Sequence, residues 1–159
     1  MVPEEKTKQE VERLMQPDHL DDVERGDPER GQTVRSEISN AMVGLKKEFY
    51  GKGPTKAKTY AHDDMIVCVL RDGLTTIEKT LSDRGMTSTV REVRIAFQEA
   101  VGDRFVAVIE ELTERRVIAF MSQMHVAPDL VIEVFVLDRP LPPASDDDVV
   151  AEGEDLVAG

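Results

Sequence analysis

The sequence has a single cysteine, Cys68, and no tryptophan, and aromatic residues make up only 4% of its 159 residues. One cysteine excludes an intrachain disulfide and a cysteine-based zinc cluster, and it agrees with a reducing cytosol. The longest apolar run is about six residues, whereas a membrane-spanning helix needs about 18–20. No charged and then apolar leader is evident at the N-terminus. We therefore expect a cytoplasmic protein that does not insert into a membrane directly.

Basic residues are also scarce, and the formal net charge is −12. The acidity belongs to the two ends of the chain. Residues 1–32 hold 10 acidic and 5 basic side chains, and residues 144–159 hold 6 acidic and none basic. The middle, residues 33–143, is nearly balanced, with 16 acidic and 15 basic side chains. This charge argues against general nucleic-acid binding, although it leaves open a local basic face on the middle of the chain.

The chain divides into one domain with two acidic ends. A length of 159 residues gives room for one domain of ordinary size. Residues 1–32 are charged and interrupted by proline and glycine, and residues 141–159 carry prolines and an acidic run. Both segments have too little apolar surface to offset the entropy of ordering, so they are predicted to be disordered. The alternative for residues 1–32 is a docking arm that orders on a partner. Residues 33–140 remain as the folded domain.

Helical spacing marks the first element of that domain. Apolar residues from Val34 to Phe49 recur every three or four positions, which predicts one face of an amphipathic helix. Thr33 or Ser36 is the expected N-cap, because a short polar side chain can satisfy the first backbone N–H groups. Gly51 is the expected end of the helix.

Two hairpins are predicted. Residues 55–61 and 65–70 form the first, around a turn at residues 62–64, and residues 117–126 and 130–137 form the second. The run of residues 65–70 (MIVCVL) is apolar throughout, as is typical of a strand that is covered on both faces. The last strand (LVIEVFVL) has the most buried-looking pattern in the chain.

Two helices lie between the hairpins. Thr75 and Glu78 have the spacing of a capping box and begin a short helix that ends at Gly85. A cap near Ser88 or Thr89 is expected to begin a long helix. The predicted order α-β-β-α-α-β-β gives an α+β fold, a single small domain with helices packed on a largely antiparallel sheet. The inward positions expected on the two helices are Ile77, Leu81, Val90, Val93, Phe97, Val101, Phe105, Val108 and Leu112.

A cluster of lysines surrounds the end of the first helix. It is the only local basic group in the nearly neutral middle of the chain, and an anion, RNA or a lipid headgroup could bind there. The alternative is an edge strand whose lysines protect it from aggregation. The cluster has few interleaved aromatic residues, so base stacking has little support. Its members are Lys46, Lys47, Lys52, Lys56 and Lys58.

The order of the first six elements also matches that of an RNA-binding KH domain. Such a domain carries a GXXG loop between its paired helices. Here the joint is residues 84–88, with a single glycine, Gly85. A nucleic-acid-binding KH-like module that uses the lysine cluster therefore stays as the alternative function.

No pattern in the sequence predicts catalysis, a metal or a cofactor. The turn at residues 51–54 (GKGP) lacks the strand, helix and G-K-S/T of a phosphate-binding loop. His62, Asp63 and Asp64 are consecutive and are not expected to converge on one ion. Arg91 and Arg94 share a helix face, where they could bind an anion or pair with carboxylates. We therefore expect a protein that is not an enzyme.

Several short motifs together resemble those of the MpsC-like family, small bacterial proteins named for a sodium-translocating, membrane-potential-generating system. The motifs are GKGP at residues 51–54, LTTIEKTL at residues 74–81, REVR at residues 91–94 and the closing Asp129 with Phe135-Val136-Leu137. The resemblance covers roughly residues 35–138, nearly all of the predicted domain.

The resemblance implies a cytosolic, non-catalytic accessory protein that is linked to a membrane ion-transport system. The family provides no settled active site to transfer. The residues that would form its shared surface are Gly51, Gly53, Pro54, Thr75, Glu78, Arg91 and Arg94. Pro54 has an equally simple explanation as a helix stop, and Thr75 and Glu78 as a cap. We also expect a homodimer, because the terminal hairpin forms strands strongly and could pair across a dimer.

Overall fold

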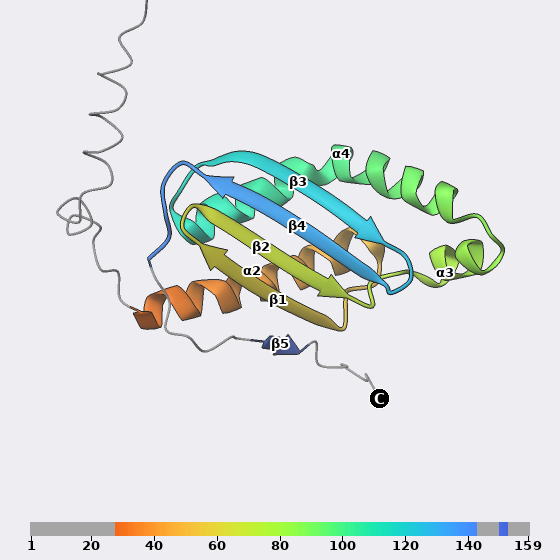
Figure 1. Ribbon diagram of the computed structural model, residues 1–159, viewed down its shortest axis with the longest axis horizontal. Helices are drawn as coiled ribbons and strands as arrows, with labels where there is room; N and C mark the ends of the chain where they lie inside the picture. Colours follow the sequence, from red (N-terminus) through yellow and green to blue (C-terminus); the bar gives the residue numbers. More distant parts are fainter. Residues whose placement is uncertain (1–27, 143–149, 153–159) are drawn as a thin grey trace, which may run out of the picture.

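The computed structural model describes residues 28–142 and 150–152, and within them the predicted α+β class and the order α-β-β-α-α-β-β are confirmed (Figure 1). One short strand follows the last predicted element. The elements are α2 (Pro28–Tyr50), β1 (Lys56–His62), β2 (Met65–Arg71), α3 (Thr76–Asp83), α4 (Thr87–Thr113), β3 (Val117–His125), β4 (Leu130–Leu137) and β5 (Val150–Glu152).

All neighbouring strands of the sheet are antiparallel, in the order β3-β4-β2-β1-β5. The two hairpins meet where β2 pairs with β4, so the sheet is continuous across the middle of the molecule. β5 lies beside β1, with Glu152 opposite Lys56, in the segment for which the sequence predicts a disordered tail. The predictions for residues 1–27, 143–149 and 153–159 lie outside the described residues.

Helix α2 begins at Pro28, before the N-cap that we expect at Thr33 or Ser36. Proline suits this place because the first helical N–H groups have no partner within the helix. The helix ends as predicted, since Gly51 has a φ of 75° and its N–H donates to the carbonyl of Lys47. A residue with a side chain would be strained there, and glycine is not.

The core lies between the sheet and the two long helices. Figure 1 shows α2 and α4 behind the sheet, while no described helix covers the side nearer the viewer. Three aromatic rings stack through the core, because Phe120 lies 6.2 Å from Phe105 and 4.6 Å from Phe135, centroid to centroid. The largest fully buried apolar side chains are Phe105, Phe135, Ile38, Met42, Ile66, Ile109, Leu137, Val90 and Cys68.

The helices α3 and α4 follow the predicted order but not every predicted contact. The capping box of Thr75 and Glu78 is present. The cap expected at Ser88 or Thr89 is wrong, because α4 begins at Thr87 and no side chain caps it. The inward positions Ile77 and Val93 are also wrong, since they are 73% and 53% exposed. The sheet packs against only one side of α4. The spacing of apolar residues placed Val93 on that side, but Val93 lies on the solvent-exposed side.

The second surface of the sheet, which we call the open face, carries apolar side chains that no described element covers. We expected residues 65–70 to be covered on both faces, and this is wrong for the single chain, because Met65 is 45% exposed and Val67 and Val69 are only half-buried. The strand register places the open-face side chains in rows across the sheet. The apolar ones are Tyr60, Met65, Val67, Val69, Ala119, Met121, Ile132, Val134 and Val136.

Candidate functional site

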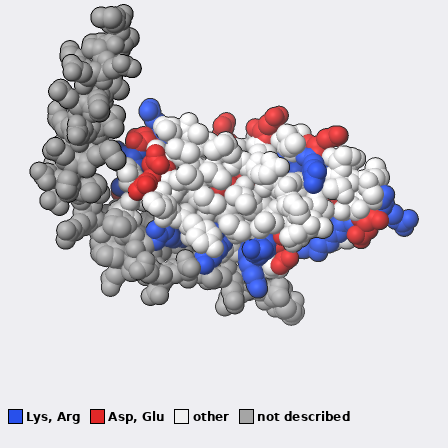
Figure 2. Space-filling view, in the orientation of Figure 1, with Lys and Arg blue, Asp and Glu red and all other residues white. Residues whose placement is uncertain are grey.

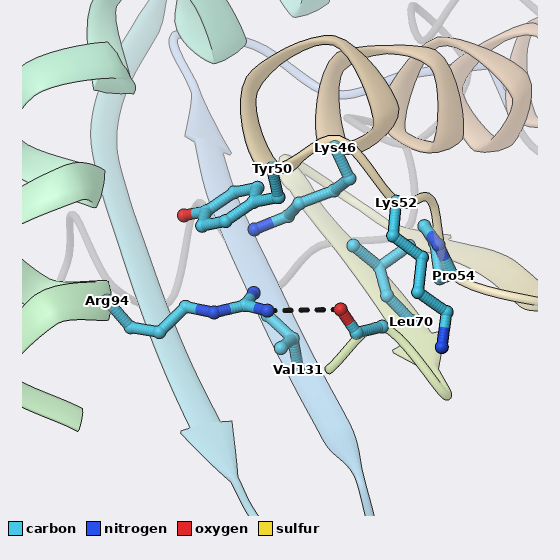
Figure 3. Close-up of a pocket in the computed structure, with 8 residues that line it drawn as sticks. Lys46, Tyr50, Lys52, Pro54, Leu70, Arg94 and Val131 are labelled. Atoms are coloured by element: carbon cyan, nitrogen blue, oxygen red, sulfur yellow. Dashed lines mark hydrogen bonds between the residues drawn. The ribbon is translucent and has the colours of Figure 1, made fainter. Parts of the chain in front are cut away.

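The buried side chain of Arg94 joins α4 to α3 and to the loop between β2 and α3. Its Nη2 donates to Glu78 Oε2 at 2.7 Å and to the carbonyl oxygen of Gly73 at 3.0 Å, and its Nε donates to Glu78 Oε1. The guanidinium also lies 4.1 Å from the centroid of the Tyr50 ring. Figure 3 shows Arg94 reaching in from α4, and Tyr50 and Lys46 reaching in from the end of α2. One arginine therefore ties α4 to α3 and to the end of β2.

Glu78 serves both the arginine and the start of α3. Its Oε2 accepts the backbone N–H of Thr75 at 2.8 Å, while the N–H of Glu78 donates to Thr75 Oγ1 at 3.2 Å. Burial alone would raise the pKa of Glu78. The hydrogen bonds from Arg94 and Thr75 outweigh this and hold that pKa below its usual value. The carboxylate is therefore kept ionised and fixed in place.

A second buried ion pair links α2 to the centre of the sheet. Lys46 Nζ lies 2.5 Å from Glu133 Oε1, and both side chains are almost fully buried. Burial lowers the pKa of Lys46, an effect that the Glu133 carboxylate opposes. Gln98 of α4 also reaches Glu133, at 3.5 Å. This pair was missed from the sequence, although a glutamate in the middle of the apolar run LVIEVFVL is the signal that could have indicated it.

The turn after α2 packs against the start of α3. Lys52 Nζ donates to the carbonyl oxygen of Leu74 at 3.1 Å, and Asp129 Oδ2 accepts the N–H of the same leucine at 2.9 Å. Pro54 is buried against Gly73, where an added Cβ would lie 3.8 Å from the proline ring. Most of the residues that the family resemblance singles out therefore meet in one place and fix the backbone.

The structure separates the predicted members of that shared surface by role. Pro54, Thr75, Glu78 and Arg94 belong to this junction. Gly53 instead packs against α2, where an added Cβ would lie 3.3 Å from the carbonyl oxygen of Val43. Gly51 ends α2 through its positive φ. Arg91 is exposed on α4, one turn before Arg94.

The predicted lysine cluster does not form one surface. Lys46 is 4% exposed and faces Glu133, and Lys52 is bonded to Leu74. Lys58 lies over the ring of Tyr60, with its Nζ 4.9 Å from the centroid. Lys47 and Lys56 are exposed on different elements. No finding in the described chain supports the KH-like alternative.

A cavity of about 270 Å³ lies between the first half of α4 and strands β3 and β4. It shares Lys46, Tyr50, Arg94 and Val131 with the pocket drawn in Figure 3. The shared residues bring two buried cations and an aromatic ring to its wall. The other lining residues are Arg91, Ile95, Gln98, Glu99, Ser122, Gln123 and Met124.

Other reactive groups in the described residues lie apart from this cavity. Cys68 is buried, and burial raises the pKa of its thiol to about 12, so it carries almost no thiolate at neutral pH. His62 and His125 are exposed at opposite ends of the sheet. Within the described ranges, no three His, Cys, Asp or Glu side chains are placed to hold a metal ion, and no helix has the length and apolar character to cross a bilayer.

Comparison with known proteins gives a family match. The family model described as Na⁺-translocating membrane potential-generating system (MpsC) matches residues 30–139. A relative from Bacillus subtilis (strain 168), the uncharacterized protein YrhF, is 27% identical over 109 residues, which cover 66% of this chain and 88% of that protein. No solved structure matches.

Proposed function

Because the chain belongs to the MpsC family of the Na⁺-translocating membrane potential-generating system, we propose that it is a non-catalytic accessory module of a membrane ion-transport system. It acts through protein contacts, and its open face is the contact surface. The family match supports the link to transport. The single observation that supports the protein contact is that the middle rows of the sheet are apolar on both faces, although no described helix covers the open face.

Strand β4 shows the apolar outward positions most clearly. An antiparallel sheet with one solvated face normally alternates apolar side chains inward and polar side chains outward. In β4 the outward positions hold Ile132, Val134 and Val136, although the inward positions are already apolar apart from the buried Glu133. The middle row of the open face continues this pattern across four strands, with Tyr60, Val67, Val134 and Met121 side by side. Such a surface is suited to a protein cover.

The space-filling view supports the same conclusion. Figure 2 shows the open face as a broad, mainly uncharged area, with acidic and basic side chains gathered along its margins. The charged side chains that the register assigns to this face, Lys56, Lys58 and Arg71, lie toward one end of β1 and β2. A chain with a net charge of −12 has therefore kept acidic side chains out of the middle rows of this face.

We propose a second copy of the chain as the cover. Four strands about 4.8 Å apart and about 25 Å long give a flat area of about 480 Å² before side-chain relief is counted. That exceeds the roughly 400 Å² that crystal-packing contacts bury on each partner. It is a little over half of the ~800 Å² that each partner buries in a standard interface. Two uncharged faces related by a two-fold axis match each other, because apolar rows then meet apolar rows.

The dimer is tested by placing a charge at the centre of the open face. Val67→Lys should convert a dimer into a monomer, because two lysines would be enclosed between apolar sheets without partners. Ile77→Lys is the matched control, since Ile77 is 73% exposed on α3, away from the open face. Light scattering after gel filtration measures the mass, and circular dichroism confirms that both variants fold. A folded Val67→Lys protein that keeps the wild-type mass would refute the open face as the dimer contact.

The transport link needs a separate experiment. The tagged chain is captured from its own lysate, with and without nuclease, and the bound proteins are identified by mass spectrometry. Recovery of a subunit of an ion-transport complex in both samples would support the accessory role. If ribosomal or nucleoid proteins were recovered only without nuclease, we would abandon the transport role for the nucleic-acid alternative.

A further inference from the structure

The cavity at α4 is separate from the proposed dimer contact. It lies on the helix side of the sheet, where Val131 of β4 and Gln98 of α4 contribute to its wall. The open face carries the side chains of the opposite register, such as Ile132 and Val134. A ligand could therefore occupy the cavity whether or not the open face is covered.

The cavity contains two cations that are already held in place. Lys46 and Arg94 are 4% and 6% exposed, and each is anchored by a carboxylate, Glu133 and Glu78 respectively. Glu78 and Gly73 occupy Nε and Nη2 of Arg94. Tyr50 also contacts this guanidinium, through a side-chain hydrogen bond and with its ring centroid 4.1 Å away. A guanidinium fixed in this way loses little entropy when it binds an anion.

Arg91 adds a cation that has no such anchor. It lines the same cavity three residues before Arg94, and α4 therefore presents both on one side. Within the described part of the chain it forms no hydrogen bond or ion pair. Glu99 also lines the cavity and offsets part of its charge. Together with Glu78 and Glu133, Glu99 makes three carboxylates against three cations, so the site has no excess positive charge for a dianion, and among the described residues Arg91 is the one cation of the cavity that no carboxylate anchors.

The remaining wall is largely apolar. Ile95, Met124 and Val131 line the cavity together with the Tyr50 ring, and Ser122 adds a hydroxyl. A volume of about 270 Å³ is at the small end of the range that holds ligands, ~300–1,000 Å³. The space suits a compact apolar body with one polar end.

We infer that this cavity binds a small organic monocarboxylate. The carboxylate would accept hydrogen bonds from Arg91, which no described carboxylate anchors, and would lie beside the fixed guanidinium of Arg94. The apolar body would lie against Tyr50, Met124 and Val131. Glu99 disfavours a dianion such as a phosphate monoester. The inference does not depend on the proposed transport role.

Thermal unfolding of the full chain tests it with defined probes. Sodium benzoate and sodium hexanoate should raise the midpoint as their concentration increases, because a ligand that binds only the native state stabilises it. Benzamide and hexanamide at the same concentrations, and sodium chloride at the same ionic strength, should not raise the midpoint. Equal stabilisation by the amides, a larger effect of sodium phosphate, or no effect of either carboxylate would overturn the inference.

Two arginine variants locate the binding. Arg91→Gln should weaken benzoate binding in calorimetry by about tenfold or more, because a charge-assisted hydrogen bond is lost. Arg104→Gln is the matched control, since Arg104 is exposed on α4 and does not line the cavity. Unchanged affinity in Arg91→Gln would refute this site. Val67→Lys should bind benzoate like the wild type, so failure of the dimer and failure of the ligand site can be told apart.

Discussion

Both faces of the sheet are largely apolar, although the long helices cover only one of them (Figure 1). The covered face contains a buried ion pair, Lys46 with Glu133, and the hydrogen-bonded side chains of Ser39 and Thr59, whose oxygens are 2.7 Å apart. The open face contains valines, isoleucine and methionine in its middle rows. Removing charges from water is costly, and leaving apolar surface in water forgoes stabilisation.

Stability of the isolated chain explains neither the charges buried on the covered face nor the apolar side chains on the open face, which no described element covers. A buried ion pair is weak evidence for stability, but it requires one relative position of the two elements that it joins. Here they fix α2 on β4, and Arg94 with Glu78 fixes α4 on α3. The covered face therefore holds the structure in one arrangement, while the open face is the surface that we propose for association.

The largest expected difference between the faces is in thiol reactivity. Cys68 of the covered face should react with a thiol reagent at least about a thousandfold more slowly than Met65→Cys of the open face, because its thiol is buried and its pKa is raised to about 12. Stopped-flow labelling measures both rates. Met86→Cys is the matched control, since Met65 and Met86 are both 45% exposed. As protein concentration rises, labelling should slow at position 65 and not at position 86.

Breaking the buried pair of the covered face should have the next largest effect. Glu133→Ala should lower the free energy of unfolding by about 3–5 kcal/mol, because it leaves Lys46 buried without a partner. Urea unfolding measures the loss. Replacing both partners, Lys46→Met with Glu133→Leu, should restore most of it. A loss below about 1 kcal/mol in Glu133→Ala would show that the charge is not buried in solution.

Removing the charge of Glu78 should cost less, about 1.5–3 kcal/mol, because hydrogen bonds to charged groups are of that size. The pKa of Glu78 is lowered on folding, so its stabilisation is fully present above the ordinary pKa of glutamate, about 4.3, and is lost as the pH falls through the lowered value. The difference in unfolding free energy between wild type and Glu78→Gln should therefore shrink in acid. A difference that stays constant with pH would exclude a contribution from ionised Glu78.

The smallest effect concerns the packing of α4 on the covered face. Gly102→Ala should raise the free energy of unfolding by about 0.5–1 kcal/mol, since a helical glycine is costly and an added Cβ would lie 3.6 Å from the Phe120 ring without a clash. Gly85→Ala should destabilise instead, because Gly85 has a φ of 79°. Thermal unfolding compares the two. Destabilisation by Gly102→Ala would mean that Phe120 packs more tightly than described.

The sequence predicts local features better than contacts between elements. Helical spacing, the capping box at Thr75 and the glycine at position 51 are local signals, and the structure confirms them. The orientation of α4 depends on what packs against it, so Val93 was misplaced. The pairing of Lys46 with Glu133 joins residues 87 positions apart, and no local rule predicts it. The motif residues were selected by resemblance alone, and the structure shows the contacts of most of them.

The most direct test of the proposed cover is sedimentation equilibrium of the unmodified chain. If the open face is closed by a second copy, the mass at micromolar concentration should be twice 17.8 kDa and should fall on dilution. A mass of 17.8 kDa across the whole concentration range would contradict the dimer.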